Sequence, residues 1–358
     1  MSKLKVALLY GGRSVEHGVS INSARNISEY IDKSLFEVFT IGISKAGVWH
    51  LTEGVTKEIE AFPKILLQLD PTNPGLRWSD SSLTPDVVFP VLHGTDGEDG
   101  SIQGLLKAMD LPMVGTGVPG SAMSMSKLVT KKLLGQAGLP VAPFRAFHYS
   151  QKNQIQFGEL KKEFGLPFMV KAASLGSSVG VSKVKSEQDF DGAIAEGFRY
   201  DDAVLIEQYI KGREIECAIL GNDPPEASLP GEIVISKNYE FYTFDAKYVD
   251  SEAVRIDVPA KLPQETMDEI RKVSVAAYQA LHCEDFARID LFLTDDQQVF
   301  VNEINTIPGF TNSSMYPMMW KERGIGFTEL ISKLIHFALE RHEKSKRIDR
   351  DYTSALKF

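Results

Sequence analysis

In the first third of the chain, short apolar runs alternate with stretches in which apolar positions recur every three or four residues. The apolar runs over Lys5–Tyr10, Glu37–Ile43 and Asp86–Leu92 predict strands. The three-to-four-residue spacing predicts a helix over Ser20–Leu35 and a shorter helix over Ser101–Met109. Strands that alternate with helices form parallel sheets covered by helices, so the pattern indicates an α/β fold. Ligands of such folds bind at the carboxyl ends of the strands.

The remainder of the chain predicts two further units. A helix over Ser126–Ala137 ends at Gly138, and the prolines that follow are typical of a helix end and a linker. Seven more strands are expected, over Pro167–Lys171, Val179–Val184, Ala203–Ile210, Glu214–Leu220, Glu232–Ser236, Asp285–Leu293 and Val299–Asn305. Two long amphipathic helices, over Gln264–His282 and Phe327–Lys344, give the C-terminal part an α+β character. We therefore expect three domains, over residues 1–120, 121–212 and 213–358.

The composition narrows the class of protein. The 358 residues are 43% hydrophobic and 24% charged, as in soluble globular proteins, with a net charge of −9. This acidic balance argues against a nucleic-acid partner. Apolar runs are too short for a membrane span or an export signal, which predicts a cytoplasmic protein with no membrane partner. The only two cysteines, Cys217 and Cys283, lack metal-ligand spacing and are expected to be buried, reduced thiols.

One loop of small residues has the chemistry of a phosphate site. The segment Lys171–Gly180 follows a predicted strand with a lysine and then glycines and serines. Its backbone N–H groups could cradle phosphate oxygens, and Lys171 supplies positive charge. The Walker A spacing is absent, and an ordinary flexible hairpin loop would look similar, so the loop alone leaves both readings open.

Two predicted strands carry charged residues on one face. Arg288 and Asp290 share a face by the two-residue period, and so do Glu303 and Asn305. Carboxylate and amide oxygens are ligands that Mg²⁺ accepts. The alternative is a buried salt-bridge set around Arg288. Because two acids and an amide outweigh one arginine, the spacing favours a metal site.

Three further loops at strand ends are candidate substrate sites. The first, Asn305–Ser314, could offer backbone N–H groups near Gly309 to an oxyanion, although a plain turn is the alternative. The second, Val91–Gly100, combines one histidine with three acids and three glycines, which favours a site over a structural histidine. In the third, Gly11–Ser20, Glu16 could hold an ammonium group, or a serine could simply cap the helix.

Together these segments resemble the D-alanine–D-alanine ligase family of the ATP-grasp superfamily. The likeness spans Gly11 to about Lys333. It is carried, in order, by GGRSVEHGVS, LHGTDGEDGSIQG, MSKLVTKKL, VKAASLGSSVGVSKV, Lys247-Tyr248, ARIDLF and NEINTIPGFTNSSMYP. Any one motif is weak, but all of them in order are specific. The resemblance implies a three-domain ATP-grasp architecture with ATP between the second and third domains. It also implies ligation of two D-alanine molecules through an acyl phosphate, for peptidoglycan precursor synthesis.

The resemblance also implies roles for individual residues. For ATP it implies the positions Lys127, Lys171, Ser178, Glu207, Gln208, Tyr209, Ile210, Glu214 and Lys247. For two Mg²⁺ ions, which Mn²⁺ can replace, it implies Asp290, Glu303 and Asn305. For catalysis it implies Glu16, Ser177, Tyr248, Arg288 and Gly309, and for the substrates it implies His93, Ser314 and Met315. The family is generally dimeric, which makes a homodimer the expected state.

The sequence departs from the family pattern at three positions that flank the chemistry. Gly18, Ser126 and Ala172 stand where a second acid, an aspartate and a proline are usual. The segment 55–82 matches nothing interpretable. Two alternative functions follow: a relative that makes a depsipeptide such as D-alanyl-D-lactate, and a nucleotide-binding regulatory protein that kept the fold without the reaction. Tyr248 favours the dipeptide over the depsipeptide, and the retained set of charged residues argues against the regulatory protein.

Overall fold

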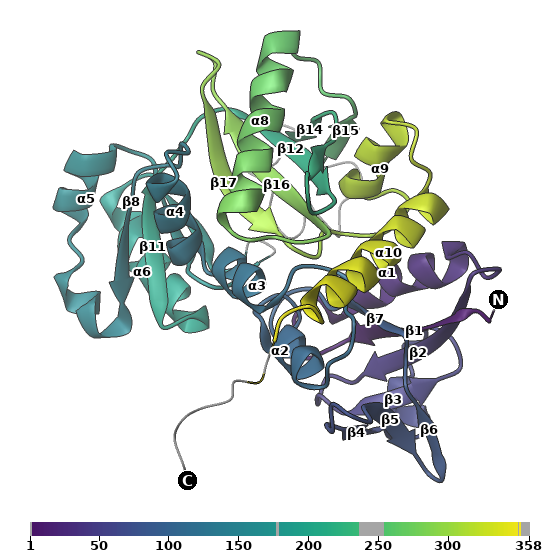
Figure 1. The fold of residues 1–358 in the computed structure, drawn as a ribbon. Coiled ribbons are helices and arrows are strands. Elements are labelled where there is room, and N and C mark those ends of the chain that lie inside the picture. Colours follow the sequence, from purple (N-terminus) through teal and green to yellow (C-terminus); the bar gives the residue numbers. More distant parts are fainter. Residues whose placement is uncertain (1, 177–178, 236–253, 350, 352–358) are drawn as a thin grey trace.

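The computed structural model describes residues 2–176, 179–235, 254–349 and 351. Three groups of strands and helices are visible in Figure 1, with the N-terminal strands at the lower right, a second group at the left and a third at the top. The expected α/β class is confirmed, because a mainly parallel N-terminal sheet with helices is followed by two antiparallel sheets with helices. The boundaries of the three domains stay a prediction.

The N-terminal sheet has the order β3-β2-β1-β7. Its parallel strands are β1 (Leu4–Gly11), β2 (Phe36–Ile43) and β7 (Val87–Val91), as predicted, and β3 (Trp49–Thr52) adds an antiparallel edge. Helix α1 (His17–Tyr30) connects β1 to β2, and α2 (Ser101–Ala108) follows β7. Helix α1 ends five residues before the predicted Leu35, because Ile31 has an extended backbone and Asp32 accepts a hydrogen bond from the Ser34 N–H at 2.8 Å.

The segment 55–82 folds mainly into a small separate sheet. A short 3-10 helix, η1 (Ile59–Ala61), precedes three antiparallel strands, β4 (Leu66–Gln68), β5 (Gly75–Trp78) and β6 (Ser81–Leu83). Leu76 and Leu83 point into a core shared with Leu9 and Val88 of the main sheet. The small sheet therefore thickens one face of the N-terminal unit.

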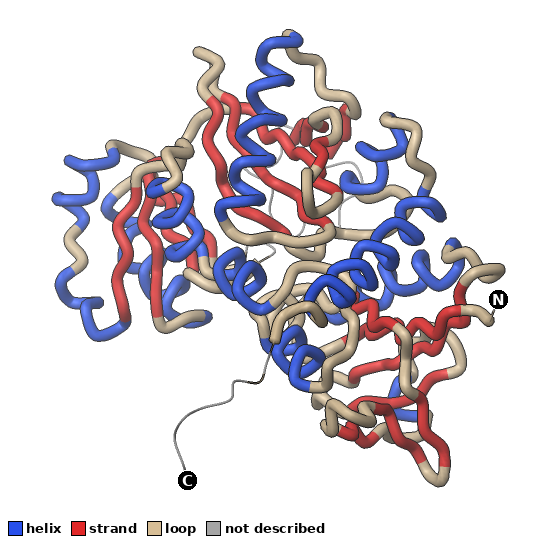
Figure 2. The backbone as a smooth tube through the Cα atoms, in the orientation of Figure 1, coloured by secondary structure: helices blue, strands red, loops and turns tan. Residues whose placement is uncertain are grey.

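The central sheet has the order β10-β9-β11-β8 and is antiparallel throughout. The predicted strands appear as β9 (Phe168–Ala172), β10 (Val181–Val184) and β11 (Ala203–Gln208). Strand β8 (Phe144–His148) and the helices η2 (Tyr149–Gln154), α5 (Phe157–Phe164) and α6 (Glu187–Tyr200) were not predicted. Helices α3 (Val118–Met125) and α4 (Lys127–Gln136) lead into this unit, whose helices lie beside the strands in Figure 2.

The C-terminal sheet has the order β15-β14-β12-β16-β17, and β13 (Glu226–Ala227) pairs with β12. The predicted strands appear as β12 (Arg213–Leu220), β14 (Gly231–Ile235), β16 (Phe286–Leu293) and β17 (Val299–Asn305), with β15 (Val254–Asp257) at the edge. Helix α8 (Gln264–Ala280) covers one face, and α9 (Met315–Glu322) and α10 (Phe327–Ser345) end the fold.

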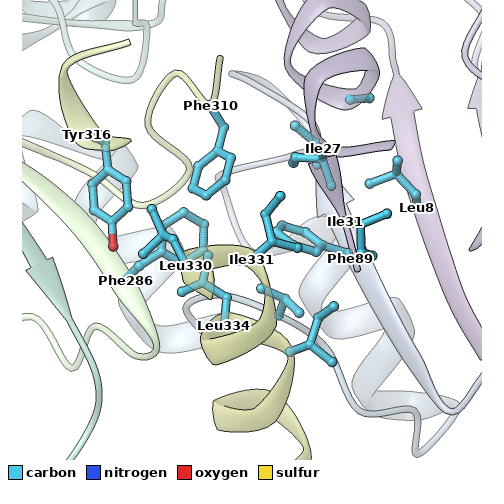
Figure 3. Packing of buried hydrophobic residues seen from close by; sticks show 14 of the residues in the cluster. Leu8, Ile27, Ile31, Phe89, Phe286, Phe310, Tyr316, Leu330, Ile331 and Leu334 are labelled. Carbon is cyan, nitrogen blue, oxygen red and sulfur yellow. The ribbon is translucent and has the colours of Figure 1, made fainter. Parts of the chain in front are cut away.

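Helix α10 does not belong to the C-terminal unit alone. Its residues Leu330, Ile331 and Leu334, all fully buried, share one core with Leu8 and Phe89 of the N-terminal sheet (Figure 3). Phe310 joins the same core from the loop after β17. Burial of so much apolar surface holds the first and last parts of the chain together.

The state of the cysteines and the absence of a membrane span were both predicted from the composition. Cys217 and Cys283 are both free and buried, as expected, and burial raises the pKa of Cys217 to about 11 and of Cys283 to about 12. Within the described ranges no helix has the length and apolar character needed to cross a membrane.

Candidate active site

A cavity of about 360 Å³ opens between the central and C-terminal sheets. It is lined from the central side by Lys127, Lys171 and the chain around the end of β11, and from the other side by β12, β14, β16 and β17. The lining includes, among the positions predicted for ATP and metal, Lys127, Lys171, Glu207, Gln208, Tyr209, Ile210, Glu214, Asp290 and Glu303. Residues far apart in sequence are thus brought to one cavity.

Lysines gather at one end of this cavity, each paired with an acid. The Lys127 Nζ lies 3.3 Å from a Glu303 carboxylate oxygen. Lys171, on β9, forms a short ion pair with Glu207 and donates to the side-chain oxygen of Asn302 at 3.2 Å. Lys131, which sequence reasoning missed, lies 2.9 Å from the other Glu207 oxygen.

Burial and charge set the ionisation of this lysine cluster. Burial alone would raise the pKa of Glu207, but Lys171 and Lys131 outweigh it and lower the pKa to about 2. Burial lowers the pKa of Lys131, and Glu207 opposes that shift. Glu207 is therefore a carboxylate near neutral pH.

A row of three acids crosses the C-terminal sheet. Glu216 on β12, Asp290 on β16 and Glu303 on β17 are direct neighbours in the strand register. Arg288 lies one pleat away, opposite Asn305. Sequence reasoning missed Glu216, although the segment Glu214-Ile-Glu216 has the same two-residue spacing as the other pairs.

Arg288 is held by two of these acids. Its Nε and Nη2 donate to the two oxygens of Asp290 at 2.7 and 2.8 Å, a bidentate pair. Its Nε also lies 3.0 Å from a Glu216 oxygen. The salt-bridge set that the sequence left open is therefore present.

The same residues also suit a divalent cation. The amide nitrogen of Asn305 donates to Asp290 at 3.0 Å, which leaves the amide oxygen as the donor atom for a metal. Three carboxylates outnumber Arg288 even after Lys127 is paired with Glu303. Within the described residues, no group of three or more His, Cys, Asp or Glu side chains is arranged to hold a metal ion, so the metal site stays a prediction. Mg²⁺ is commonly bound by only one or two protein carboxylates together with phosphate and water.

The second part of the site lies where the N-terminal sheet meets the C-terminal loop. Glu16 precedes α1 and is buried. A Cβ atom added to Gly94 would lie 2.8 Å from a Glu16 oxygen, and one on Gly176 would lie 3.5 Å from it. The loops after β7 and β9 therefore both approach Glu16.

His93 is buried beside Glu16 and the C-terminal loop. Its Nε2 lies 3.0 Å from the Ser23 hydroxyl, and its Nδ1 lies 2.9 Å from the Ile307 carbonyl oxygen. Burial lowers the pKa of His93, against the attraction of Glu16. The ring is neutral near pH 7.

The predicted oxyanion and carboxylate loop runs from Asn305 to Ser314 and ends at the start of α9. Ser314 precedes the helix, and its hydroxyl lies 3.1 Å from the Thr311 N–H. The side chain of Met315 is buried in the core against Gly231, so only its backbone N–H can serve an anion at this helix start. Ser177, Ser178, Lys247 and Tyr248 lie outside the described residues.

The three departures from the family pattern have ordinary local roles. Gly18 has open space around its Cβ position in the first turn of α1. The Ser126 hydroxyl caps α4 by accepting from the Val129 N–H. Ala172 is buried in β9.

Comparison with known proteins agrees with this geometry. The profile described as D-ala D-ala ligase N-terminus matches residues 5–116, and the one described as D-ala D-ala ligase C-terminus matches residues 133–336. The chain belongs to the D-alanine–D-alanine ligase family. The resemblance predicted from the sequence and the ATP-grasp architecture are thereby confirmed.

Individual relatives match over nearly their full length. D-alanine–D-alanine ligase A of Salmonella typhimurium is 47% identical, over 96% of this chain and 97% of the relative. The D-alanine–D-alanine ligase of Oceanobacillus iheyensis is 44% identical, over 97% of this chain and 98% of the relative.

Two solved structures share the fold. The D-alanine–D-alanine ligase from Coxiella burnetii has a TM-score of 0.84 at 36% identity, over 96% of this chain and 98% of that one. The VanG D-Ala:D-Ser ligase from Enterococcus faecalis has a TM-score of 0.85 at 32% identity, over 94% of this chain and 100% of that one.

Proposed function

We propose that the protein uses ATP to join two D-alanine molecules into D-alanyl-D-alanine, with ADP and phosphate as the other products. The supporting observation is the lysine-lined cavity that ends at the row of acids on β16 and β17. Relatives at 44–47% identity named as D-alanine–D-alanine ligases support the choice of substrate. The product is a precursor for peptidoglycan.

ATP would lie in the cavity between the two sheets. The adenine would contact the hinge from Glu207 to Ile210, and Glu214 would hold the ribose. The phosphates would take over Lys127 and Lys171 from Glu303 and Glu207, because a phosphate carries more negative charge than a carboxylate. Ser178 and Lys247 complete the set proposed from the sequence.

Asp290, Glu303 and Asn305 would hold two Mg²⁺ ions, which Mn²⁺ can replace. A bound divalent ion neutralises charge on the transferring phosphoryl group. The lysines act beside it, and Arg288 keeps Asp290 oriented through its bidentate contact.

The first D-alanine would bind with its ammonium at Glu16 and with His93 beside it. Its carboxylate oxygen attacks the γ-phosphorus, ADP leaves, and an acyl phosphate forms. This intermediate must be kept from water, a role we assign to the segments with Ser177 and Tyr248.

The second D-alanine would place its carboxylate at Ser314 and the N–H of Met315. Its amine attacks the acyl carbon, phosphate leaves, and the amine loses a proton. Arg288 and the Gly309 N–H would stabilise the negative charge on the carbonyl oxygen of the tetrahedral intermediate. The predicted homodimer and cytoplasmic location are further parts of this proposal.

The direct test is phosphate release by the purified protein with ATP, Mg²⁺ and one amino acid at a time. Release with D-alanine but not L-alanine, together with D-alanyl-D-alanine as product, is the expected result. Absence of release under conditions where ATP binds would overturn the proposal and favour the non-catalytic regulatory reading.

A second function is a ligase with a different second substrate. A structural neighbour at 32% identity is named a D-Ala:D-Ser ligase, so the fold itself does not fix the acceptor. Competition assays of D-serine and D-lactate against D-alanine, at several pH values, distinguish the three products. Preferential formation of D-alanyl-D-alanine is expected.

Removal of the Arg288 side chain tests its role in the second step. The substitution Arg288→Ala is expected to lower kcat by about a hundredfold or more, because an oxyanion-stabilising group is lost. The matched control is Arg145→Ala, which removes an arginine of the edge strand β8 that pairs with Glu159 of α5. A kcat for Arg288→Ala within a few-fold of wild type would remove Arg288 from this role.

A further inference from the structure

Glu98 connects two loops that are far apart in the sequence. One oxygen of its carboxyl group accepts a hydrogen bond from the Gly94 N–H at 2.8 Å, within the loop after β7. The other accepts from the Ile307 N–H at 2.9 Å, in the loop after β17. A single side chain therefore spans the junction between the N-terminal sheet and the C-terminal loop.

The peptide groups of Ile307 are held on both sides. Its N–H donates to Glu98, and its carbonyl oxygen lies 2.9 Å from Nδ1 of His93. A weaker contact follows at the Phe310 N–H, 3.4 Å from the Ser23 hydroxyl, which itself lies 3.0 Å from Nε2 of His93. Ile307 is thus the point at which the loop is fixed most directly.

The two loops carry different halves of the proposed reaction. His93, in the loop after β7, and the adjacent Glu16, which precedes α1, are assigned to the first substrate. Gly309 and Ser314, in the loop after β17, are assigned to the oxyanion and the second substrate. Peptide formation needs the attacking amine and the acyl carbon at a defined separation, and a misplacement of about 1 Å can cost about a hundredfold in rate. The spacing between these loops is therefore part of the chemistry.

We infer that Glu98 is a positioning residue, which fixes the backbone from Ile307 to Gly309 against the loop that carries His93 and so sets the distance between the two substrate sites. Glu16 and Arg288 are the charged side chains that act on the Glu98 carboxyl group electrostatically. This inference rests on the proposed function for its kinetic consequence, but the backbone attachment itself does not.

The test uses the substitution Glu98→Gln in the full-length protein. Glutamine keeps the size of the side chain but presents an NH₂ group to one of the two N–H donors, so one hydrogen bond is lost. We expect the KM for the second D-alanine to rise and kcat to fall, each by about tenfold, while the KM for ATP stays within twofold of wild type.

Asp99→Asn is the matched control. Asp99 is the next residue, and its carboxylate also accepts two backbone N–H bonds, but both come from its own segment, at Asp96 and Ser101. The control should leave all three constants within twofold. Equal losses in the two variants, an equal rise in the KM for ATP, or a Glu98→Gln enzyme within twofold of wild type would each overturn the inference.

Amide hydrogen exchange provides a readout that needs no activity. In wild type the Ile307 amide should be protected, and in Glu98→Gln the amides from Ile307 to Phe310 should exchange at least tenfold faster, with α8 unchanged. An unprotected Ile307 amide in wild type would overturn the attachment even if the variant does not fold. If wild type makes no dipeptide, the proposed function fails while the exchange result still decides the attachment.

Discussion

At the scale of single residues, the buried pair of Lys131 and Glu207 joins a residue that the sequence did not point to with one that it predicted for ATP binding. Both side chains are at most 3% exposed, and Glu207 also contacts Lys171. Glu207 lies in the segment assigned to the adenine hinge. A buried charge depends on its partners, so Lys171 and Lys131 together hold the hinge carboxylate in its ionised form.

We predict that Lys131→Met raises the KM for ATP by about tenfold, since loss of one partner of a buried charge pair costs about 2 kcal/mol or more. The KM for D-alanine should not change. Lys132→Met is the control, because Lys132 is the next residue and is exposed. An unchanged KM for ATP in Lys131→Met would show that Lys171 alone is sufficient.

Glu98 predicts an unusual pH dependence of stability. Burial and the nearby charge of Glu16 raise its pKa from 4.5 to about 8. Between these two values the folded protein binds a proton that the unfolded chain has released, so stability falls as pH rises from about 5 to 8. Glu98→Gln has no carboxyl group to ionise at this position. We therefore expect wild type to lose stability relative to the variant, measured as the free energy of unfolding, as pH rises from about 5 to 8. Chemical denaturation at pH 5 and pH 8 measures the difference, and a difference that grows with pH would contradict the shifted pKa.

At the scale of elements, turns at strand ends bring the site together. Gly94 has a φ of 77°, and a Cβ atom there would lie 2.5 Å from the Ser14 hydroxyl and 2.8 Å from a Glu16 oxygen. Only glycine fits this turn without displacing Glu16. The Gly-rich character of the loop is therefore a requirement of the site.

We predict that Gly94→Ala lowers kcat/KM for D-alanine by about tenfold or more, because displacement of Glu16 disturbs binding of the first substrate. Gly18→Ala is the matched control, since a Cβ there meets nothing within 4 Å. The control should keep wild-type kinetics and gain slightly in stability from the helix preference of alanine. Steady-state assays and thermal unfolding check both variants.

The elements that could be predicted from the sequence share a long, regular pattern. Strand β7 and all but the first two residues of β1 are apolar runs buried on both faces, and the second half of β2 is buried in the same way. Strands β4 and β6 have three residues each and carry polar or exposed positions, too short for any period to show. Helix α6 was missed although Ser186 and Asp189 form a capping box before its buried face.

The presence or absence of a regular pattern in the sequence also separates the predicted site residues from the missed ones. Asp290, Glu303 and Asn305 could be proposed from the sequence because polar residues recur at strand spacing in otherwise apolar segments. Glu216 had the same signal and was overlooked. Lys131 had none, because its partner Glu207 lies 76 positions later and only the folded chain brings them together.

At the scale of the whole molecule, one buried cluster joins three parts of the chain. Asp285 is fully buried and accepts hydrogen bonds from the Gly115 N–H, from Asn222 and from Arg341 on α10. Arg341 also donates to the carbonyl oxygens of Met113 and Gly115. The last helix is thereby fixed to the segment that follows the N-terminal sheet.

We predict that Arg341→Met lowers the free energy of unfolding by about 3 kcal/mol or more, because Asp285 keeps a buried charge without its main partner. Lys344→Met on the same helix removes only an exposed pair with Glu340 and should cost less than about 1 kcal/mol. Chemical denaturation of both variants measures the difference. Equal decreases in the free energy of unfolding for the two variants would show that the buried Asp285–Arg341 contact contributes no more to stability than an exposed ion pair.

The shared core of α10 and the N-terminal sheet has a consequence for the order of synthesis. The apolar surface formed by Leu8 and Phe89 of the sheet and by Ile27 of α1 leaves the ribosome early. Leu330, Ile331 and Leu334, which pack against it, are added near the end. Until then the nascent chain exposes an apolar surface that α10, together with Phe310, covers in the finished protein. Exposed surface of this kind promotes aggregation. The core of the N-terminal sheet is therefore completed last, and the time for which it stays uncovered includes the time needed to synthesise the rest of the chain.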